Sequence, residues 1–211
     1  MTRKPTEPAL RSKTQAPLGR RPGVSSEQTQ KELLRAARVV FAQKGYRGAT
    51  IAEIVRRADV TSPVLYHHFG NKAGLFRAAV LEVADLLRSA WDRALVDKDT
   101  LRERVDAMLV AAVDIHALDP QLAPFLIAAR IEAVRHPELR SMEEYRQSAI
   151  SIFEKVVADS GIEGDRRETI VNVCGAMFAG LTVIGAESAQ LDYDETAESL
   201  RTVLDSSLFD S

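Results

Sequence analysis

Cysteine is almost absent from this chain, because Cys174 is the only one among 211 residues. A single cysteine excludes a disulfide within one chain. We also find no run of the about eighteen uncharged apolar residues that a membrane-spanning helix needs. The basic N-terminus has no apolar segment behind it, which argues against a secretory signal. These absences predict a protein of the reducing cytoplasm, associated with the nucleoid if it binds DNA.

The residue types that build metal centres and catalytic sites are also scarce. Four histidines and one cysteine are few for a metal site, and the HExxH, GxSxG and phosphate-loop patterns are missing. His67 and His68 are neighbours, so on a helix they would point about 100° apart and chelate poorly. We therefore expect no enzymatic activity, no cofactor and no bound metal.

The net charge of −2 conceals a strong asymmetry along the chain. Residues 1–77 carry fifteen Lys/Arg and five Asp/Glu, whereas the remainder carries 13 basic and 25 acidic residues. Such a split suggests that the N-terminal part meets a polyanion. A solvated basic tail that binds nothing would give the same composition, so charge alone does not decide the function.

Spacing of the apolar residues predicts an all-α fold of about nine helices. Residues 1–25 are rich in proline, glycine and basic residues, cannot bury a core, and are expected to form a disordered arm. From residue 26 onward the period is helical, and no strand-like alternation is long enough to suggest a sheet. We expect a small DNA-binding domain at 26–72 and a helical domain at 73–211. The expected longer helices are 27–44, 72–95, 100–118, 120–134, 137–160, 165–189 and 194–208.

Two short helices between residues 50 and 70 predict a helix-turn-helix. Thr50 and Glu53 have the spacing of a capping box at the start of the first. Thr61 or Ser62 would cap the second, in which Pro63 is tolerated in the first turn. Packed on helix 27–44, the pair would form a small bundle with one helix free to enter a groove of DNA. Its expected core is Leu34, Phe41, Ile51, Ile54, Ala58, Val60, Leu65 and Phe69.

The stretch 45–76, GYRGATIAEIVRRADVTSPVLYHHFGNKAGLF, closely resembles the N-terminal domain of the tetracycline-repressor (TetR) family. The resemblance spans residues 27–76. Two positions depart from the family pattern: Asp59 stands where glycine is common, and Asp tolerates a left-handed backbone. Gly74 stands where a good helix former is usual, at a cost of up to about 1 kcal/mol. The matching positions are Phe41, Gly45, Tyr46, Thr50, Ile51, Ile54, Ala58, Val60, Ser62, Leu65, Tyr66, His68, Phe69, Lys72, Leu75 and Phe76.

The resemblance implies a set of DNA-contacting residues in this half of the chain. The family places phosphate contacts at the positions of Thr50, Tyr66, His67 and Lys72, and base contacts at the N-terminal end of the recognition helix. The alternative to a DNA contact is a structural role in packing, which is open for Tyr66, His68 and Val64. The arm residues just before the first helix could enter the minor groove, or act as a nonspecific tail. The full expected set is Arg20, Arg21, Thr50, Ser62, Pro63, Val64, Tyr66, His67, His68 and Lys72.

The resemblance also implies that the C-terminal domain binds a ligand and forms a dimer. A basic residue in the apolar segment around Arg130 needs a partner, which Glu132, Glu138 or an anionic ligand could supply. Small residues spaced along helix 165–189 would let two helices approach closely across a two-fold axis, although this helix could instead be buried within its own subunit. Cys174 is expected to be a buried small hydrophobe. The expected pocket residues are Trp91, Met108, His116, Phe125, Arg130 and Tyr145, and the expected interface residues are Gly175, Ala176, Ala179 and Gly180.

Together these features predict a sequence-specific transcriptional regulator. It would be a homodimer that binds double-stranded, palindromic operator DNA and represses a nearby operon until an unidentified small-molecule effector releases it. The alternative is a DNA-bound factor of the same fold that recruits other proteins or organises the chromosome. An activator is also compatible, since the sequence does not show where the operator lies relative to a promoter.

Overall fold

A computed structural model describes residues 25–136, 139, 151–158, 160–187 and 192–204. The described residues are largely helical and include no strand, which confirms the all-α prediction. The expected arm up to residue 24 and most of the expected helix 137–160 lie outside them. In chain order the helices are α1 (Ser26–Gly48), α2 (Ile51–Ala58), α3 (Ser62–Phe69), α4 (Lys72–Ala94), α5 (Leu101–Leu118), α6 (Leu122–Arg135), α8 (Gly164–Ala186) and α9 (Tyr193–Leu204), with residues 151–158 helical between α6 and α8.

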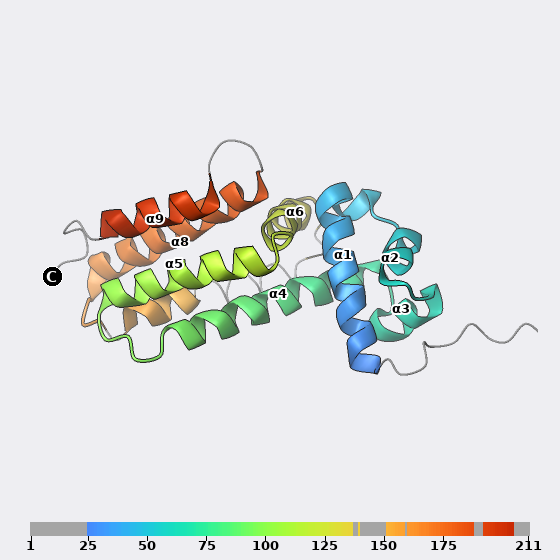
Figure 1. Cartoon of the computed structure of the whole chain (residues 1–211), viewed down its shortest axis with the longest axis horizontal. Helices are drawn as coiled ribbons and strands as arrows, with labels where there is room; N and C mark the ends of the chain where they lie inside the picture. The colour runs from blue at the N-terminus through green and yellow to red at the C-terminus, as the bar shows by residue number, and fades with distance from the viewer. Residues whose placement is uncertain (1–24, 137–138, 140–150, 159, 188–191, 205–211) are drawn as a thin grey trace, which may run out of the picture.

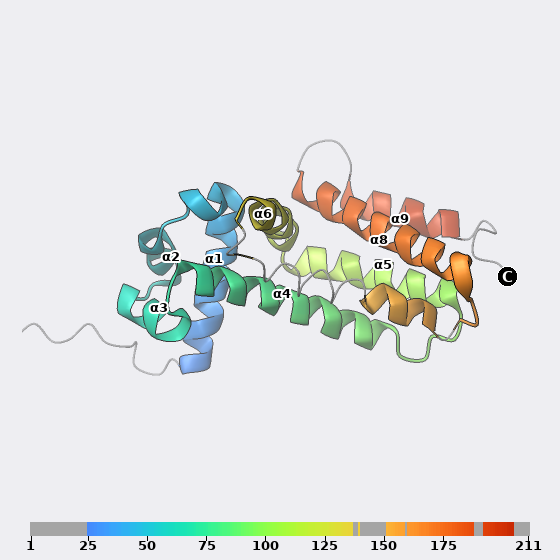
Figure 2. The ribbon, with the colours of Figure 1, turned by 180° about the vertical axis from the view of Figure 1, so that it is seen from behind.

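The helices lie along an elongated molecule with α1, α2 and α3 at one end (Figure 1). Helices α5, α8 and α9 lie side by side at the other end, as the reverse view also shows (Figure 2). The long helix α4 runs from the first group into the second, and α6 crosses between them against α1. The two groups are therefore joined through α4 and α6.

Local sequence signals explain how the first group folds. Gly45 has φ +66°, which breaks the regular course of α1 near the expected stop, although the helix is assigned through Gly48. The Thr50 hydroxyl accepts a hydrogen bond from the Glu53 backbone N–H at 3.3 Å and caps α2. Asp59 ends α2 with φ 52° and ψ 47°, the left-handed conformation expected of the residue that replaces glycine.

The start of α4 shows why glycine stands at position 74. Asn71 caps the helix, since its Oδ1 accepts a hydrogen bond from the Gly74 N–H at 2.8 Å. A Cβ at residue 74 would lie 2.1 Å from the Phe69 carbonyl oxygen, far inside contact distance. The sequence-based expectation of a weakened helix position is thus incomplete, because a better helix former would collide with the end of α3.

Two hydrophobic cores lie along the molecule. The first is centred on α1–α3 and extends into α4 and α6, with the Phe76 ring 5.0 Å from Phe41 and 6.1 Å from Phe125, measured between centroids. The expected helix-turn-helix core is found there: Leu34, Phe41, Ile54, Ala58 and Leu65 are buried, and Ile51, Val60 and Phe69 pack against them. The second core joins α4, α5, α8, α9 and residues 151–158. Because α6 contributes to the first core, its position depends on both ends of the molecule.

Helix α8 corrects the expectation that no segment is long and apolar enough to span a membrane. It holds an 18-residue window of mean hydropathy 1.8 with no more than two charged residues, of which 17% is buried inside the protomer. A single helix of this kind also occurs in water-soluble proteins and does not assign the chain to a membrane. It does leave a long apolar surface without a partner among the described residues.

Candidate functional site

Helix α3 presents the side chains expected to contact DNA. It lies at the outer end of the molecule beside α2 (Figure 1). Pro63, Tyr66 and His67 are exposed, with 49% of the Tyr66 side chain accessible. Leu65 is completely buried and anchors α3 to the first core. The helix therefore has one face in the core and another open to a groove.

Three of the expected DNA-contacting residues on α3 are only half-exposed. Ser62 lies at the first position of the helix, where a side chain can still reach outward. Val64 packs against the first core. The His68 ring lies 5.5 Å from the His67 ring and 5.9 Å from the Phe69 ring, between centroids. Val64 thus contributes to packing in addition to its predicted contact with DNA, whereas the ring contacts of His68 are with its two neighbours in the chain.

The structure brings Thr50 and Lys72 together beside the recognition helix. Thr50 is exposed at the N-terminus of α2. Lys72 begins α4, and its ammonium donates a hydrogen bond to the Ala49 carbonyl oxygen at 3.0 Å. The same Nζ lies 4.7 Å from the centroid of the Tyr46 ring, a cation–π distance. Lys72 therefore ties the end of α1 to the start of α4.

Further basic side chains lie near this surface and were not among the expected contacts. Arg47 follows Tyr46 at the end of α1, and its carbonyl oxygen lies 3.5 Å from Lys72 Nζ. Arg47 on α1 and Arg56 on α2 are exposed, and neither guanidinium pairs with another residue that the structure describes. The positive charge of residues 1–77 is the sequence signal that could have singled them out. Arg20 and Arg21 lie outside the described residues.

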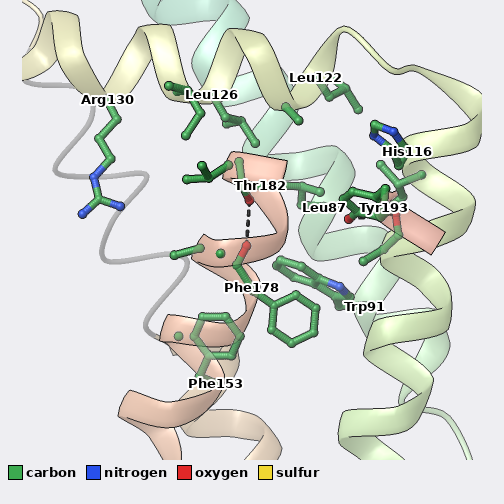
Figure 3. Close-up of a pocket in the computed structure, with 18 of the residues that line it drawn as sticks. Leu87, Trp91, His116, Leu122, Leu126, Arg130, Phe153, Phe178, Thr182 and Tyr193 are labelled. Atoms are coloured by element: carbon green, nitrogen blue, oxygen red, sulfur yellow. Dashed lines mark hydrogen bonds between the residues drawn. The ribbon is translucent and has the colours of Figure 1, made fainter. Parts of the chain in front are cut away.

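A pocket of about 670 Å³ lies between α4, α5, α6, α8 and residues 151–158 (Figure 3). Its wall contains an aromatic cluster, in which the Trp91 ring lies 5.6 Å from Phe178 and 6.2 Å from Phe153. Also in the lining, His116 on α5 stacks on Tyr193, the first residue of α9, with 4.1 Å between ring centroids. Burial raises the pKa of the Tyr193 hydroxyl to about 12, so this group stays neutral. The pocket is largely apolar and suits a small hydrophobic molecule.

Half of the expected pocket residues line this cavity. Trp91, His116 and Arg130 do, whereas Met108 and Phe125 are fully buried in the second and first cores. Tyr145 lies outside the described residues. The sequence missed apolar lining residues such as Leu87, Leu126, Phe153 and Phe178, because apolar residues at helical spacing look the same in a core and around a cavity.

Arg130 lies at the edge of the pocket, exposed and projecting from α6 (Figure 3). It forms no ion pair with any residue in the described ranges. Its expected partner Glu132 is buried beside Gly45 of α1 instead, and its Oε2 lies 3.3 Å from Nε2 of His136 at the end of α6. The other expected partner, Glu138, is outside those ranges. Among the described residues, Arg130 is thus a positive charge without an ion-pair partner beside an apolar cavity.

Three of the four small residues expected to form a dimer interface line the pocket. These are Gly175, Ala179 and Gly180, and a Cβ at Gly175 would lie 3.9 Å from the Phe153 ring. Gly180 is also exposed, and a Cβ there would meet nothing within 4 Å. Ala176 is exposed and is not a pocket residue, so it is the one of the four that faces away from the cavity.

Within the described part of the chain, no cluster of three or more His, Cys, Asp or Glu side chains could hold a metal.

Comparison with known proteins identifies the family. The sequence model of the family "bacterial regulatory proteins, tetR family" matches residues 33–79, which contain α2, α3 and the start of α4. The chain is 31% identical over 161 residues to the transcriptional activator FasR of Mycolicibacterium smegmatis, covering 75% of this chain and 69% of FasR. It is 25% identical over 177 residues to the regulator BetI of Paraburkholderia phymatum, covering 82% and 88%.

Solved structures share the fold over most of their length. A TetR-family regulator from Rhodococcus superposes with a TM-score of 0.70 at 20% identity, covering 85% of this chain and 97% of that one. FadR of Bacillus subtilis, in complex with stearoyl-CoA, gives a TM-score of 0.67 at 16% identity and covers 83% and 97%. The relatives are transcriptional regulators rather than enzymes. The chain therefore belongs to the TetR family of bacterial regulatory proteins and is a DNA-binding transcriptional regulator with a helix-turn-helix.

Proposed function

We propose that this regulator is a homodimeric repressor that an apolar small molecule releases from operator DNA. The observation that carries the proposal is the pocket of about 670 Å³ in the same chain as an exposed recognition helix. Small-molecule sites usually measure about 300–1,000 Å³ and are mainly apolar with a few polar groups. A pocket of this size and lining favours a ligand-responsive regulator over a purely architectural DNA-binding protein.

Operator DNA would be held mainly through its phosphates. Thr50, Tyr66, His67 and Lys72 are the proposed phosphate contacts, and Arg47 adds an exposed guanidinium to the same region. Backbone contacts of this kind position a protein on the duplex without carrying sequence information.

Base recognition is assigned to the N-terminal end of α3. The Ser62 hydroxyl can hydrogen-bond to several bases, and Val64 offers apolar contact to a thymine methyl group. Pro63 is exposed beside them. Because none of these is a bidentate reader, we expect specificity to be spread over several weak contacts and over the shape of the DNA.

We propose that the ligand is an amphiphile with an apolar body and an anionic group. The aromatic and aliphatic lining of the pocket would take the body, and the Arg130 guanidinium at its edge, which pairs with no carboxylate in the described ranges, would take the anion. Stearoyl-CoA, which FadR of Bacillus subtilis binds, combines a long acyl chain with phosphates. That similarity of fold supports the class of ligand and makes stearoyl-CoA the first molecule to test.

The dimer is proposed to form through α8, together with α9. Val173, Ala176, Gly180 and Val183 are exposed at intervals of three or four residues, so they form one stripe along α8, of which Gly180 and Val183 also border the pocket. Small residues in such a stripe let two helices approach closely, and α8 with α9 from each subunit would form a four-helix packing across the two-fold axis. Burying the stripe would also cover the apolar surface that the protomer leaves open.

The mechanism that we propose is a change in the spacing of the two recognition helices. A dimer fits successive major grooves when these helices lie about 34–36 Å apart, or a multiple of that distance. A ligand that favours a different arrangement of α4 and α6 would change this spacing, and ligand and DNA would then weaken each other's binding, typically by about 1–3 kcal/mol.

The test begins with selection of bound fragments from genomic DNA by the purified protein. A gel shift on the enriched site at two salt concentrations then measures specificity, with and without stearoyl-CoA and with stearate as a second probe. Release of a short palindromic site by either amphiphile supports the proposal. Purely salt-sensitive binding to any DNA contradicts the sequence-specific interpretation.

A promoter reporter distinguishes repression from activation. The relative FasR is named as a transcriptional activator. Higher reporter expression in a strain lacking the regulator supports a repressor. Lower expression overturns that part of the proposal and assigns an activator instead.

A further inference from the structure

Arg38 on α1 is a buried charge with two carboxylate partners from other helices. Its side chain is 8% exposed. One terminal nitrogen, Nη1, donates to Glu82 on α4, and the other, Nη2, donates to Asp119 Oδ2 at 2.8 Å. The pair with Glu82 is itself partly desolvated, since burial raises the pKa of that carboxyl while Arg38 lowers it. A guanidinium in this setting holds α1, α4 and the corner between α5 and α6 in one fixed relation.

Asp119 belongs both to this cluster and to the wall of the pocket. It ends α5, and its Oδ1 accepts a hydrogen bond from the Gln121 N–H at 3.2 Å, so it shapes the corner that leads into α6. The neighbouring residues His116 and Leu122 also line the pocket. A molecule that fills the cavity and moves this corner therefore moves the carboxylate that Arg38 binds.

The other links between α6 and the first core are apolar or lie away from the cavity. Leu122 and Leu126 join or pack against that core and also line the pocket, but they carry no charge. Phe125 and Ala129 join α6 to the first core through apolar packing. The Glu132 side chain lies against Gly45 of α1, where a Cβ would be 2.8 Å from its Oε1. Neither Glu132 nor His136 is among the residues that line the pocket. Arg38 is thus the buried charge on α1 that pairs directly with a pocket residue.

We infer that Arg38 is a positioning residue that transmits occupancy of the pocket to the DNA-binding helices, through its paired contacts with Asp119 and Glu82. This inference rests on the proposed ligand-responsive function. The pairing has strict geometry, and a buried guanidinium that loses one carboxylate is strongly destabilised. A small movement of the corner therefore favours a discrete change in the position of α1, whereas apolar contacts would allow gradual sliding.

The test replaces the unknown ligand by a side chain that fills the pocket. Ile127→Trp adds volume from α6 at a half-buried position in the lining. Operator affinity is measured by fluorescence anisotropy for the native chain, Ile127→Trp, Arg38→Met and the double variant. We expect Ile127→Trp to lower affinity about 5- to 150-fold, the usual range of coupling between sites. In the Arg38→Met background, the same filling should change affinity less than about 2-fold.

Arg35→Met is the matched control, because Arg35 is an exposed arginine on the same helix, one turn before Arg38. It should keep the full effect of Ile127→Trp. Arg38→Lys retains the buried charge and can serve one carboxylate, and Asp119→Asn leaves the pair of Arg38 with Glu82 in place. Both should reduce the effect of filling, and they provide folded variants if Arg38→Met does not fold, which circular dichroism reports.

The outcomes separate this inference from the proposed function. An equal effect of Ile127→Trp with and without the Arg38 contacts overturns the role of Arg38 and leaves the ligand-responsive regulator intact. No effect of Ile127→Trp in the native background overturns the coupling of this pocket to DNA, and with it both proposals. Loss of the effect in the Arg38 and Asp119 variants, with the Arg35 control unchanged, supports the inference.

Discussion

Single residues in this molecule serve folding and function at once, and Lys72 is the clearest example. The sequence places it at the start of a helix, where its charge adds to the positive helix end. The structure adds the hydrogen bond to the Ala49 carbonyl and the contact with the Tyr46 ring. One ammonium therefore stabilises the junction between α1 and α4 and is also the proposed phosphate contact.

We expect Lys72→Met to weaken operator binding at all sequences alike and to lower the slope of log K against log salt by about 0.9. The loss of one phosphate contact is the physical reason. Salt titrations of anisotropy measure the slope, and thermal unfolding measures the accompanying loss of stability. Lys31→Met is the control, since Lys31 pairs at the surface with Glu27 on its own helix. An unchanged slope in Lys72→Met would exclude a phosphate contact.

Cys174 is expected to be chemically inert in the folded protein. It is 1% exposed, and burial raises the pKa of its thiol from 9.0 to about 11. At pH 8 the thiolate that reacts with a disulfide reagent is then about 100-fold less abundant than at the ordinary pKa, apart from steric protection. The measurement is the rate of labelling by a chromogenic disulfide, before and after unfolding in guanidinium chloride.

The native labelling rate should therefore be at least about 100-fold lower than the unfolded one. Because Cys174 is the only cysteine of the chain, the labelling reports this site alone. Equal rates in the native and unfolded protein would show that the thiol is open and would contradict the buried role.

Helices are the scale at which the sequence was most informative. Thr50 caps α2 through a side-chain hydrogen bond, as its spacing from Glu53 predicts, because a cap depends on residues that are neighbours in the chain. The resemblance of residues 27–76 likewise placed α3 and its exposed side. Local spacing was sufficient for these features.

The pocket could not be predicted in the same way, because it depends on helices far apart in the sequence. Trp91, Phe153 and Phe178 meet from three different elements. Met108 and Phe125 carry the same signal of large apolar residues but lie in closed cores. Which apolar residue faces a cavity is decided by how the helices cross, and one helix's periodicity does not contain that information.

Gly74→Ala tests the close contact between the end of α3 and the start of α4. Helix propensity and this contact predict opposite changes in the free energy of unfolding. Helix propensity predicts a gain of up to about 1 kcal/mol. The collision with the Phe69 carbonyl oxygen predicts instead a loss of about 1–3 kcal/mol, because backbone of α3 or α4 must shift. Chemical denaturation measures the free energy of unfolding.

Gly175→Ala is the matched control within a helix, since its Cβ would lie 3.9 Å from the nearest side chain, an ordinary contact. It should leave stability unchanged or raise it by up to about 1 kcal/mol. A gain in stability for Gly74→Ala would show that the junction between α3 and α4 has room for a side chain.

At the scale of the whole molecule, charge and apolar surface are separated in space. The basic end carries α1–α3, and the other end carries α8 with an apolar window of which 17% is buried in the protomer. Ion pairs such as Lys155 with Asp92 lie on the surface of that end at 2.6 Å and are expected to contribute little. The open face of α8 is therefore the surface whose burial matters most for the assembled protein.

Ala176→Glu tests that surface without touching the pocket, since Ala176 is exposed on α8 and is not a pocket residue. Two carboxylates would meet near the two-fold axis in a packed, desolvated interface, which is strongly unfavourable. Light scattering after size exclusion should give the protomer mass of 23.2 kDa in place of twice that value. Operator affinity should fall as well, because the two half-sites would no longer be bound by one linked unit.

Ala117→Glu is the control for added charge, because Ala117 is an exposed alanine on α5, away from α8 in sequence. This variant should keep the dimer mass and the operator affinity of the native chain. If Ala176→Glu also keeps the dimer, the outward face of α8 is not the interface. If Ala176→Glu loses operator binding but remains a dimer, the substitution acts on the coupling between the C-terminal helices and the DNA-binding helices. The Ile127→Trp and Arg38 variants measure that coupling separately.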